Sequence, residues 1–297
     1  MTESVHATEL LLFSVLLQLI VMIGAARVFN SLARALGQPG VIGEIVAGLM
    51  LGPSLFGFFF PETAGQLFGA KASAPITVIS QIGLILLMFQ IGTDFEFGHL
   101  RTARNRAATL WVAAASVSVP SVLGFAFGWA SASTLAPSID PLTYSLFCGV
   151  AVAITAVPIL GRILREFGLT RAPIGVMAIA AAAINDVVGW VLLAGISAYA
   201  TAQLSGAFVL WQAGGLVAGV LVLWFALRPF AGWLLRAMPV RDGSVPPGLM
   251  ATVLCLMFAL GIATNAIGIF TIFGGFAAGL LFHHHVAFVE AWRRQVG

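Results

Sequence analysis

Residues 178–194 read AIAAAAINDVVGWVLLA and lie at the centre of an apolar run from about residue 173 to residue 200. A run of this length can cross a hydrocarbon core of about 30 Å as one helix. Asp186 is the only Asp, Glu, Lys, Arg or His between Arg171 and Arg228. Because a lone carboxylate at mid-membrane depth costs about 2.5 to 3.5 kcal/mol on insertion scales, the stretch predicts an ion or proton site at Asp186.

The composition extends this membrane interpretation to the whole chain. Of the 297 residues, 60% are hydrophobic and 8% are charged. We therefore predict an all-α polytopic membrane protein, with a single transmembrane domain over residues 1–297 and no soluble domain. Nine apolar stretches are long enough to span the bilayer, namely 8–28, 41–57, 76–93, 108–131, 142–160, 174–199, 207–227, 247–264 and 267–283.

The basic residues predict the orientation of these spans. Thirteen of the fourteen Lys and Arg residues follow odd-numbered spans, and only Lys71 falls on the other side. The positive-inside rule then places the loops after odd-numbered spans in the cytoplasm and the N-terminus outside. We expect a multi-pass protein of the bacterial inner (plasma) membrane, surrounded by lipid bilayer. The basic excess is a topology signal, so no nucleic-acid partner is expected.

The fifth span contains a proline well inside its apolar run, SLFCGVAVAITAVPILGRIL at residues 145–164. Pro158 has no backbone N–H and its ring clashes with the carbonyl four residues back. The helix is therefore predicted to break across Ala156, Val157 and Pro158. In transporters, such breaks expose main-chain oxygens and helix ends that hold ions. Thr155 lies within one turn of the break and adds a hydroxyl.

Helix six supplies a second polar group, because Asn185 directly precedes Asp186 and four alanines at 180–183 precede both. Small side chains let a neighbouring helix cross closely, so we expect the broken helix beside Asp186. Burial favours the protonated carboxyl, whereas a bound cation favours the ionised form. One carboxylate can thus carry either a proton or a cation. The alternative is a structural carboxyl that is hydrogen-bonded to Asn185 or to a hydroxyl.

Five segments, in order along nearly the whole chain, carry a resemblance: QPGVIGEIVAGLMLGPSLFG (38–57), IGLILLMFQIGTDFEF (82–97), AITAVPILGRILREFGLT (153–170), AIAAAAINDVVGWVLLA (178–194) and GIFTIFGGFAAGLLF (268–282). They resemble signature blocks of the monovalent cation:proton antiporter-2 family. This family is Na+/H+ exchanger-like and similar to plant cation/H+ exchangers and Kef-type K+/H+ antiporters. The ITAVPILGRIL and INDVVGW pair is the most specific part of the match.

The resemblance implies a sodium/proton antiporter inverted-repeat fold of about thirteen transmembrane helices, with two crossed discontinuous helices at its core. It also implies a homodimer. By position, Asp186 would carry the transported cation or proton, and Asn185 and Thr155 would assist it. An Asn in the first position of this pair is associated in the family with electroneutral one-for-one exchange.

The C-terminus departs from the family pattern. This chain has about nine of the helices and stops at RRQVG soon after the ninth. Family members continue with about four more, including the second discontinuous helix and a basic residue that faces the acidic site. The resemblance therefore implies a C-terminally truncated member, equivalent to the N-terminal part of one antiporter domain.

Three further polar residues are candidates for an ion pathway, each with a structural alternative. Glu44 lies about one turn inside the second span, where a carboxylate can instead cap the helix N-terminus. Gln90 lies within the third span and can bond to another helix. Asp94 lies at the end of that span near Arg101 and Arg104, which is also typical of a solvated interface.

The combined prediction is a secondary active transporter and not an enzyme, because no catalytic constellation or phosphate-binding glycine loop is present in a suitable context. It would exchange K+ or Na+ for H+ by alternating access at the single carboxylate of Asp186. No cofactor is expected, and no metal beyond the transported cation. Two alternatives stay open, a gated K+ efflux pathway and a non-transporting fragment of an antiporter.

Overall fold

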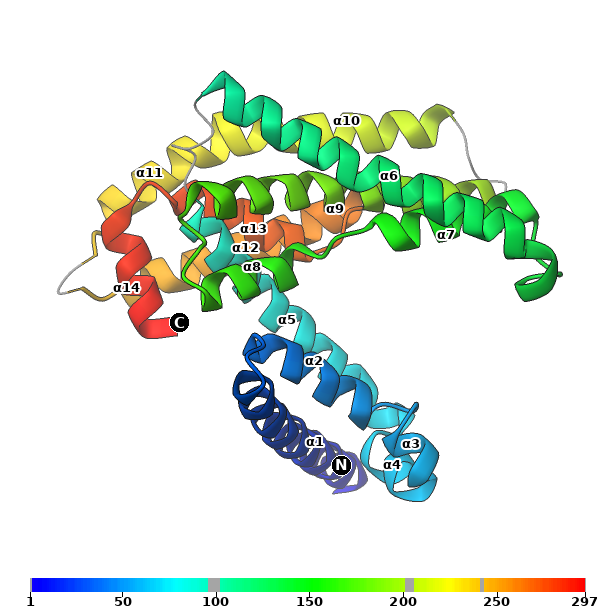
Figure 1. Ribbon diagram of the computed structural model, residues 1–297. Coiled ribbons are helices and arrows are strands. Elements are labelled where there is room, and N and C mark those ends of the chain that lie inside the picture. Colours follow the sequence, from blue (N-terminus) through cyan, green and yellow to red (C-terminus); the bar gives the residue numbers. More distant parts are fainter. Residues whose placement is uncertain (1, 96–101, 201–205, 241–242, 297) are drawn as a thin grey trace. The chain divides into compact units, whose positions relative to one another are not determined.

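The computed structural model describes residues 2–95, 102–200, 206–240 and 243–296. The regular elements of these residues are helices (Figure 1). The N-terminal part contains α1 (Thr2–Ala35), α2 (Gly40–Leu51), α3 (Phe56–Phe59), α4 (Pro61–Leu67) and α5 (Ala70–Asp94). The remainder contains α6 (Ala103–Leu135), α7 (Pro141–Ala153), α8 (Val157–Glu166), α9 (Pro173–Ala200), α10 (Gly206–Val222), a π turn (Leu223–Leu227), α11 (Arg228–Ala237), α12 (Pro247–Ala266), α13 (Ile272–Phe282) and α14 (Val286–Val296).

The chain divides into two compact units. Unit 1 comprises Met1–Gly83 and Arg165–Phe167, and unit 2 comprises Leu84–Leu164 and Gly168–Gly297. Within unit 1, α1 packs against α2. Within unit 2, α6, α7 and α9 pack together, and α12 packs against α13. The start of α7 is defined by Asp140, whose carboxylate accepts hydrogen bonds from the Thr143 backbone N–H (2.8 Å) and hydroxyl (2.9 Å). These bonds hold the pKa of Asp140 below its ordinary value.

The all-α membrane fold is confirmed, with corrections to several predicted spans. Eight helical stretches of the described residues are long and apolar enough to cross a membrane, and 272–282 is a shorter apolar helix. The predicted span 267–283 is wrong as one continuous helix, because Gly268 adopts a left-handed φ of 80° after α12 and the next helix starts at Ile272. The span 41–57 is interrupted, since α2 ends at Leu51 before an extended Gly52.

Helices α5, α12 and α13 are in close backbone contact through glycines. A Cβ on Gly274 would lie 2.1 Å from the Gly261 backbone N, and one on Gly279 would lie 2.3 Å from the Phe89 backbone O. A ring cluster at one end of this contact contains Phe89, Phe282, Phe288 and Trp292. Such close contact needs small residues, because the backbone on the other side cannot move as a side chain can.

We expect Gly274→Ala to lower the stability of the folded chain by about 1 to 3 kcal/mol, the usual range for overpacking. The added methyl group meets the backbone of α12, so the helices must separate. Thermal unfolding in detergent measures the effect. Gly219→Ala on α10 is the matched control, since its Cβ would meet nothing within 4 Å. An unchanged melting temperature for Gly274→Ala would contradict the close packing.

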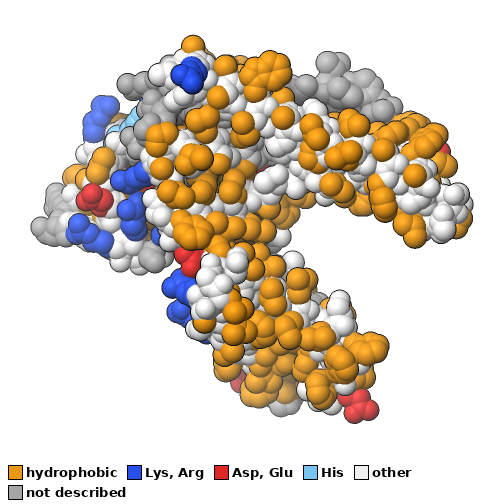
Figure 2. All heavy atoms as spheres, viewed as in Figure 1, with side chains coloured by type: hydrophobic (Ala, Val, Ile, Leu, Met, Phe, Trp, Pro, Cys, Tyr) orange, Lys and Arg blue, Asp and Glu red, His pale blue; other side chains and the backbone are white. Residues whose placement is uncertain are grey.

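The charged side chains of unit 2 are unevenly distributed. Figure 2 shows Lys and Arg side chains gathered at the end of this unit where α11 and α14 lie, while hydrophobic side chains cover the helices away from that end. Arg101 and Arg241, which contributed to the predicted orientation, lie outside the described residues. A charged end and an apolar flank are the arrangement of a bundle that spans a bilayer.

Candidate ion-binding site

The fifth predicted span is broken into two helices. α7 ends at Ala153, residues 154–156 are not helical, and α8 begins at Val157. The predicted break at Ala156, Val157 and Pro158 is therefore misplaced, because only Ala156 lies in it. Pro158 occupies the first turn of α8, where a missing N–H removes no intrahelical hydrogen bond. The break consequently comprises Ile154, Thr155 and Ala156.

Asp186 lies on α9 against the start of α8. Its Oδ2 accepts a hydrogen bond from the Val157 backbone N–H at 2.8 Å, and the residue is only 4% exposed. The first N–H groups of a helix have no intrahelical acceptor, and the helix dipole favours a negative charge there. The N-terminus of α8 thus stabilises the ionised carboxylate of Asp186, which is buried away from water.

Asn185 connects α9 with α6 and with the break at the same place. Its Nδ2 donates to Ser116 Oγ on α6 at 3.1 Å and lies 3.5 Å from Thr155 Oγ1 in the break. Ser116 in turn donates its hydroxyl hydrogen to the Ala113 carbonyl at 2.9 Å. Asn185 is 1% exposed, and within the described residues its Oδ1 has no hydrogen-bond partner. A buried amide oxygen that accepts no hydrogen bond is available to act as a ligand for a cation.

The approach of α9 to the break depends on a small residue on the neighbouring turn. A Cβ on Gly189 would lie 2.6 Å from Ile154 Cγ1, so a side chain there would have to displace the Ile154 side chain in the break. Ala181 and Ala182 are also buried, at 4% and 5% exposure. The structure therefore places Asp186, Asn185 and Thr155 at one location. Ser116 was missed by sequence reasoning, and only its polarity within an apolar span could have marked it.

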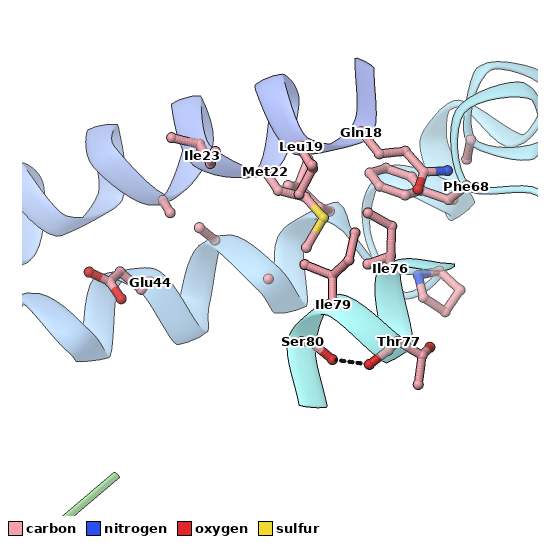
Figure 3. Close-up of a pocket in the computed structure, with 18 residues that line it drawn as sticks. Gln18, Leu19, Met22, Ile23, Glu44, Phe68, Ile76, Thr77, Ile79 and Ser80 are labelled. Atoms are coloured by element: carbon pink, nitrogen blue, oxygen red, sulfur yellow. Dashed lines mark hydrogen bonds between the residues drawn. The ribbon is translucent and has the colours of Figure 1, made fainter. Parts of the chain in front are cut away.

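Glu44 lies elsewhere, beside an apolar cavity of about 800 Å³ within unit 1. Figure 3 shows Glu44 and Gln18 toward opposite ends of this cavity, with Leu19, Met22 and Ile23 between them. The Glu44 carboxylate accepts a hydrogen bond from Asn30 Nδ2 at 2.8 Å.

Glu44 does not cap the N-terminus of α2, as the structural alternative had it. There the Gly40 backbone N–H donates to both carboxylate oxygens of Glu166, at 2.9 Å each. Glu166 also pairs with Arg34 at 2.9 Å. Glu166 therefore holds the N-terminus of α2, and a pathway role for Glu44 stays a prediction.

The remaining pathway candidates lie at the end of α5. Asp94 is 8% exposed and forms an ion pair with Arg293 of α14. The structural alternative, a solvated interface near Arg101 and Arg104, differs from this arrangement, because Asp94 is buried and bonds to a residue 199 positions further along the chain. The Gln90 carbonyl accepts the Thr93 hydroxyl at 2.8 Å. Pathway roles for Gln90 and Asp94 stay predictions.

These features define a polytopic helical membrane protein with a buried carboxylate at a broken helix. The pattern of the sodium/hydrogen exchanger transmembrane family matches residues 18–292, and the chain belongs to this family. The resemblance seen in the sequence is thereby confirmed.

Three relatives illustrate the family. The chain is 33% identical over 266 residues to Cation/H(+) antiporter 18 of Arabidopsis thaliana, covering 90% of this chain and 32% of the relative. It is 32% identical to the Na(+)/H(+) antiporter NhaS4 of Synechocystis sp., with 91% and 65% covered, and 29% identical to K(+)/H(+) antiporter 1 of Saccharomyces cerevisiae, with 82% and 28% covered. The chain thus spans about a third of the length of its plant and yeast relatives.

Proposed function

We propose that this chain contains the ion-binding site of a K+/H+ or Na+/H+ antiporter, with Asp186 as the single carboxylate shared by proton and cation. The observation that carries the proposal is the pairing of a buried carboxylate with a vacant carbonyl oxygen. Asp186 and Asn185 are consecutive residues of α9, and their side chains contact Val157 and Thr155 at the break in the fifth span, while Asn185 Oδ1 has no hydrogen-bond partner within the described residues. Relatives named as cation/H+, Na+/H+ and K+/H+ antiporters support it.

The physical step is competition at one site. When Asp186 is ionised, its charge and the neutral oxygens of Asn185 and Thr155 are suitable ligands for a monovalent cation. When Asp186 is protonated, that charge is absent and the cation is released. If the site opens alternately to each side of the membrane, loading one ion and releasing the other couples the two gradients. We propose alternating access for this reason. We also propose, from the family resemblance, that the protein is a homodimer and, from the distribution of basic residues, that its N-terminus is outside.

Reconstitution of the full chain into liposomes with an internal pH dye tests the function. We expect K+ or Na+, and not choline, to dissipate an imposed pH gradient with saturable kinetics. Large single-channel currents in a planar bilayer would instead support the gated efflux pathway and overturn the antiport proposal. No cation-dependent flux at all would support a non-transporting fragment.

Replacing Val157 by Pro should reduce exchange at neutral pH by about tenfold or more, since a hydrogen bond to a charged group is worth about 1.5 to 3 kcal/mol. The change removes the N–H that Asp186 accepts, while proline remains compatible with the first turn of α8. Val157→Ala keeps the N–H and is the matched control. Exchange rates in everted vesicles measure both variants, and equal rates for the two would contradict a role for this donor.

A further inference from the structure

A charged hollow lies on unit 2 at the junction of the π turn and α11. It has a volume of about 580 Å³. It is lined by three aromatic residues, two arginines, a proline and a glycine. These are Trp224, Phe225, Arg228, Pro229, Gly232, Trp233 and Arg236. The opposite face of α11 contributes Ala231 and Leu234 to the hydrophobic core. The helix is therefore anchored on one side and presents its arginines on the other.

The two arginines lean along the same face of the helix. The guanidinium of Arg228 lies over the Trp224 ring, with Cζ 4.5 Å from the ring centroid. Arg236 Nη2 lies 3.9 Å from where a Cβ on Gly232 would be, so this guanidinium folds back over the glycine. Helical side chains lean toward the N-terminus, which explains the common direction. The eight-residue separation corresponds to about 12 Å of helix rise.

Within the part of the chain that the structure describes, neither Arg228 nor Arg236 forms an ion pair with a carboxylate, whereas Arg34, Arg293 and Arg294 each do. The positive charges of Arg228 and Arg236 extend to the neighbouring imidazoles, where, after burial, they help to lower the pKa values of His283 and His285 and so favour their neutral forms. Burial, His284 and Arg236 together lower the pKa of His285. Among the described residues, the hollow is thus a cationic surface whose two arginines have no carboxylate partner.

Its aromatic residues indicate a position at the level of lipid headgroups. Trp224 and Phe225 lie in the π turn that follows the end of α10, and Trp233 lies on α11; they are exposed by 60%, 72% and 58%. Exposed tryptophans at the end of a transmembrane helix lie at the bilayer interface. A π turn, here Leu223–Leu227, is also a local irregularity that occurs often at functional sites.

We propose that this hollow binds the headgroup of an anionic glycerophospholipid. One guanidinium would donate charge-assisted hydrogen bonds to the phosphate oxygens, and the other would add its positive charge to the same site. The exposed rings would contact the glycerol and the first acyl carbons. The aromatic lining selects a lipid over a free phosphate ion, which offers no apolar part to these rings. This site lies apart from the proposed exchange function and does not depend on it.

Lipid titration of the purified full chain in detergent, followed by native mass spectrometry, tests the site. We expect phosphatidylglycerol to bind more tightly than phosphatidylcholine. Arg228→Gln with Arg236→Gln should weaken phosphatidylglycerol binding about 25-fold, at about fivefold or 1 kcal/mol per arginine near an anionic surface. Gly232→Glu, which keeps both arginines and adds a carboxylate between them, should weaken it similarly. Binding of phosphatidylcholine should be unchanged in both variants.

The matched control is Arg104→Gln with Arg294→Gln, which removes the same charge from exposed positions outside the hollow. It should retain phosphatidylglycerol binding. Three outcomes would overturn the proposal: equal binding of the two lipids by the parent chain, an equal loss in the control, or displacement of the lipid by soluble glycerol phosphate at similar concentration. The last outcome would indicate a site for free anions.

Discussion

Asp186→Asn should reduce cation-dependent proton flux in everted vesicles to the level of vesicles without the protein. The substitution removes the group that exchanges a proton for a cation, but an amide oxygen can still accept the Val157 N–H, so the helix start remains satisfied. Membrane insertion and thermal stability should therefore be retained. The effect is expected to be a loss of at least about 100-fold, as when an essential proton-transfer group is removed.

Asp140→Asn is the matched control for this result. It makes the same chemical change at an exposed carboxylate that caps α7 outside the spans. We expect exchange in this variant to equal that of the parent chain. Transport at the parent rate by Asp186→Asn would show that Asp186 is not the carrier.

Asn185→Asp should change the pH dependence of exchange. It places a second carboxylate beside Asp186 in a position that is 1% exposed, and it removes the amide donor to Ser116 and Thr155. Two interacting acids titrate as a pair, so the pH of half-maximal exchange should move by about one unit or more.

A series of exchange rates between about pH 5 and pH 9 measures this change. Asn265→Asp is the control, since Asn265 lies exposed at the end of α12. Its profile should overlay that of the parent. If the pH dependence of exchange by Asn185→Asp were the same as that of the parent, residue 185 would not interact with the titrating site.

Sequence reasoning predicted those features of the site that depend on residues close together in the chain. A proline inside an apolar run predicts a break, and a lone carboxylate in the next run predicts a site, because both arguments need only neighbouring residues. The break was misplaced by two residues because Pro158 fits the first turn of a new helix. The interruption after Leu51 was also missed, although Gly52 and Pro53 are visible in the sequence.

The contacts that sequence reasoning could not reach join distant parts of the chain. Ser116 meets Asn185 across 69 positions, and Arg293 meets Asp94 across 199. Neither pair has a local pattern, because their meeting depends on how whole helices pack. The role of the Val157 N–H as a donor to Asp186 was likewise unforeseen. The sequence suggested that the break would offer oxygens to a cation. Instead, the first N–H group of α8, directly after the break, donates to the carboxylate that is proposed to bind the cation.

Proton release on cation binding tests the shared carboxylate most directly. K+ or Na+ is added to the purified chain in weakly buffered detergent solution near neutral pH, and the released protons are followed with a pH indicator. If proton and cation exclude each other at Asp186, the parent should release up to about one proton per bound cation, and Asp186→Asn should release none. Cation binding without proton release by the parent, or equal release by Asp186→Asn, would contradict the shared site.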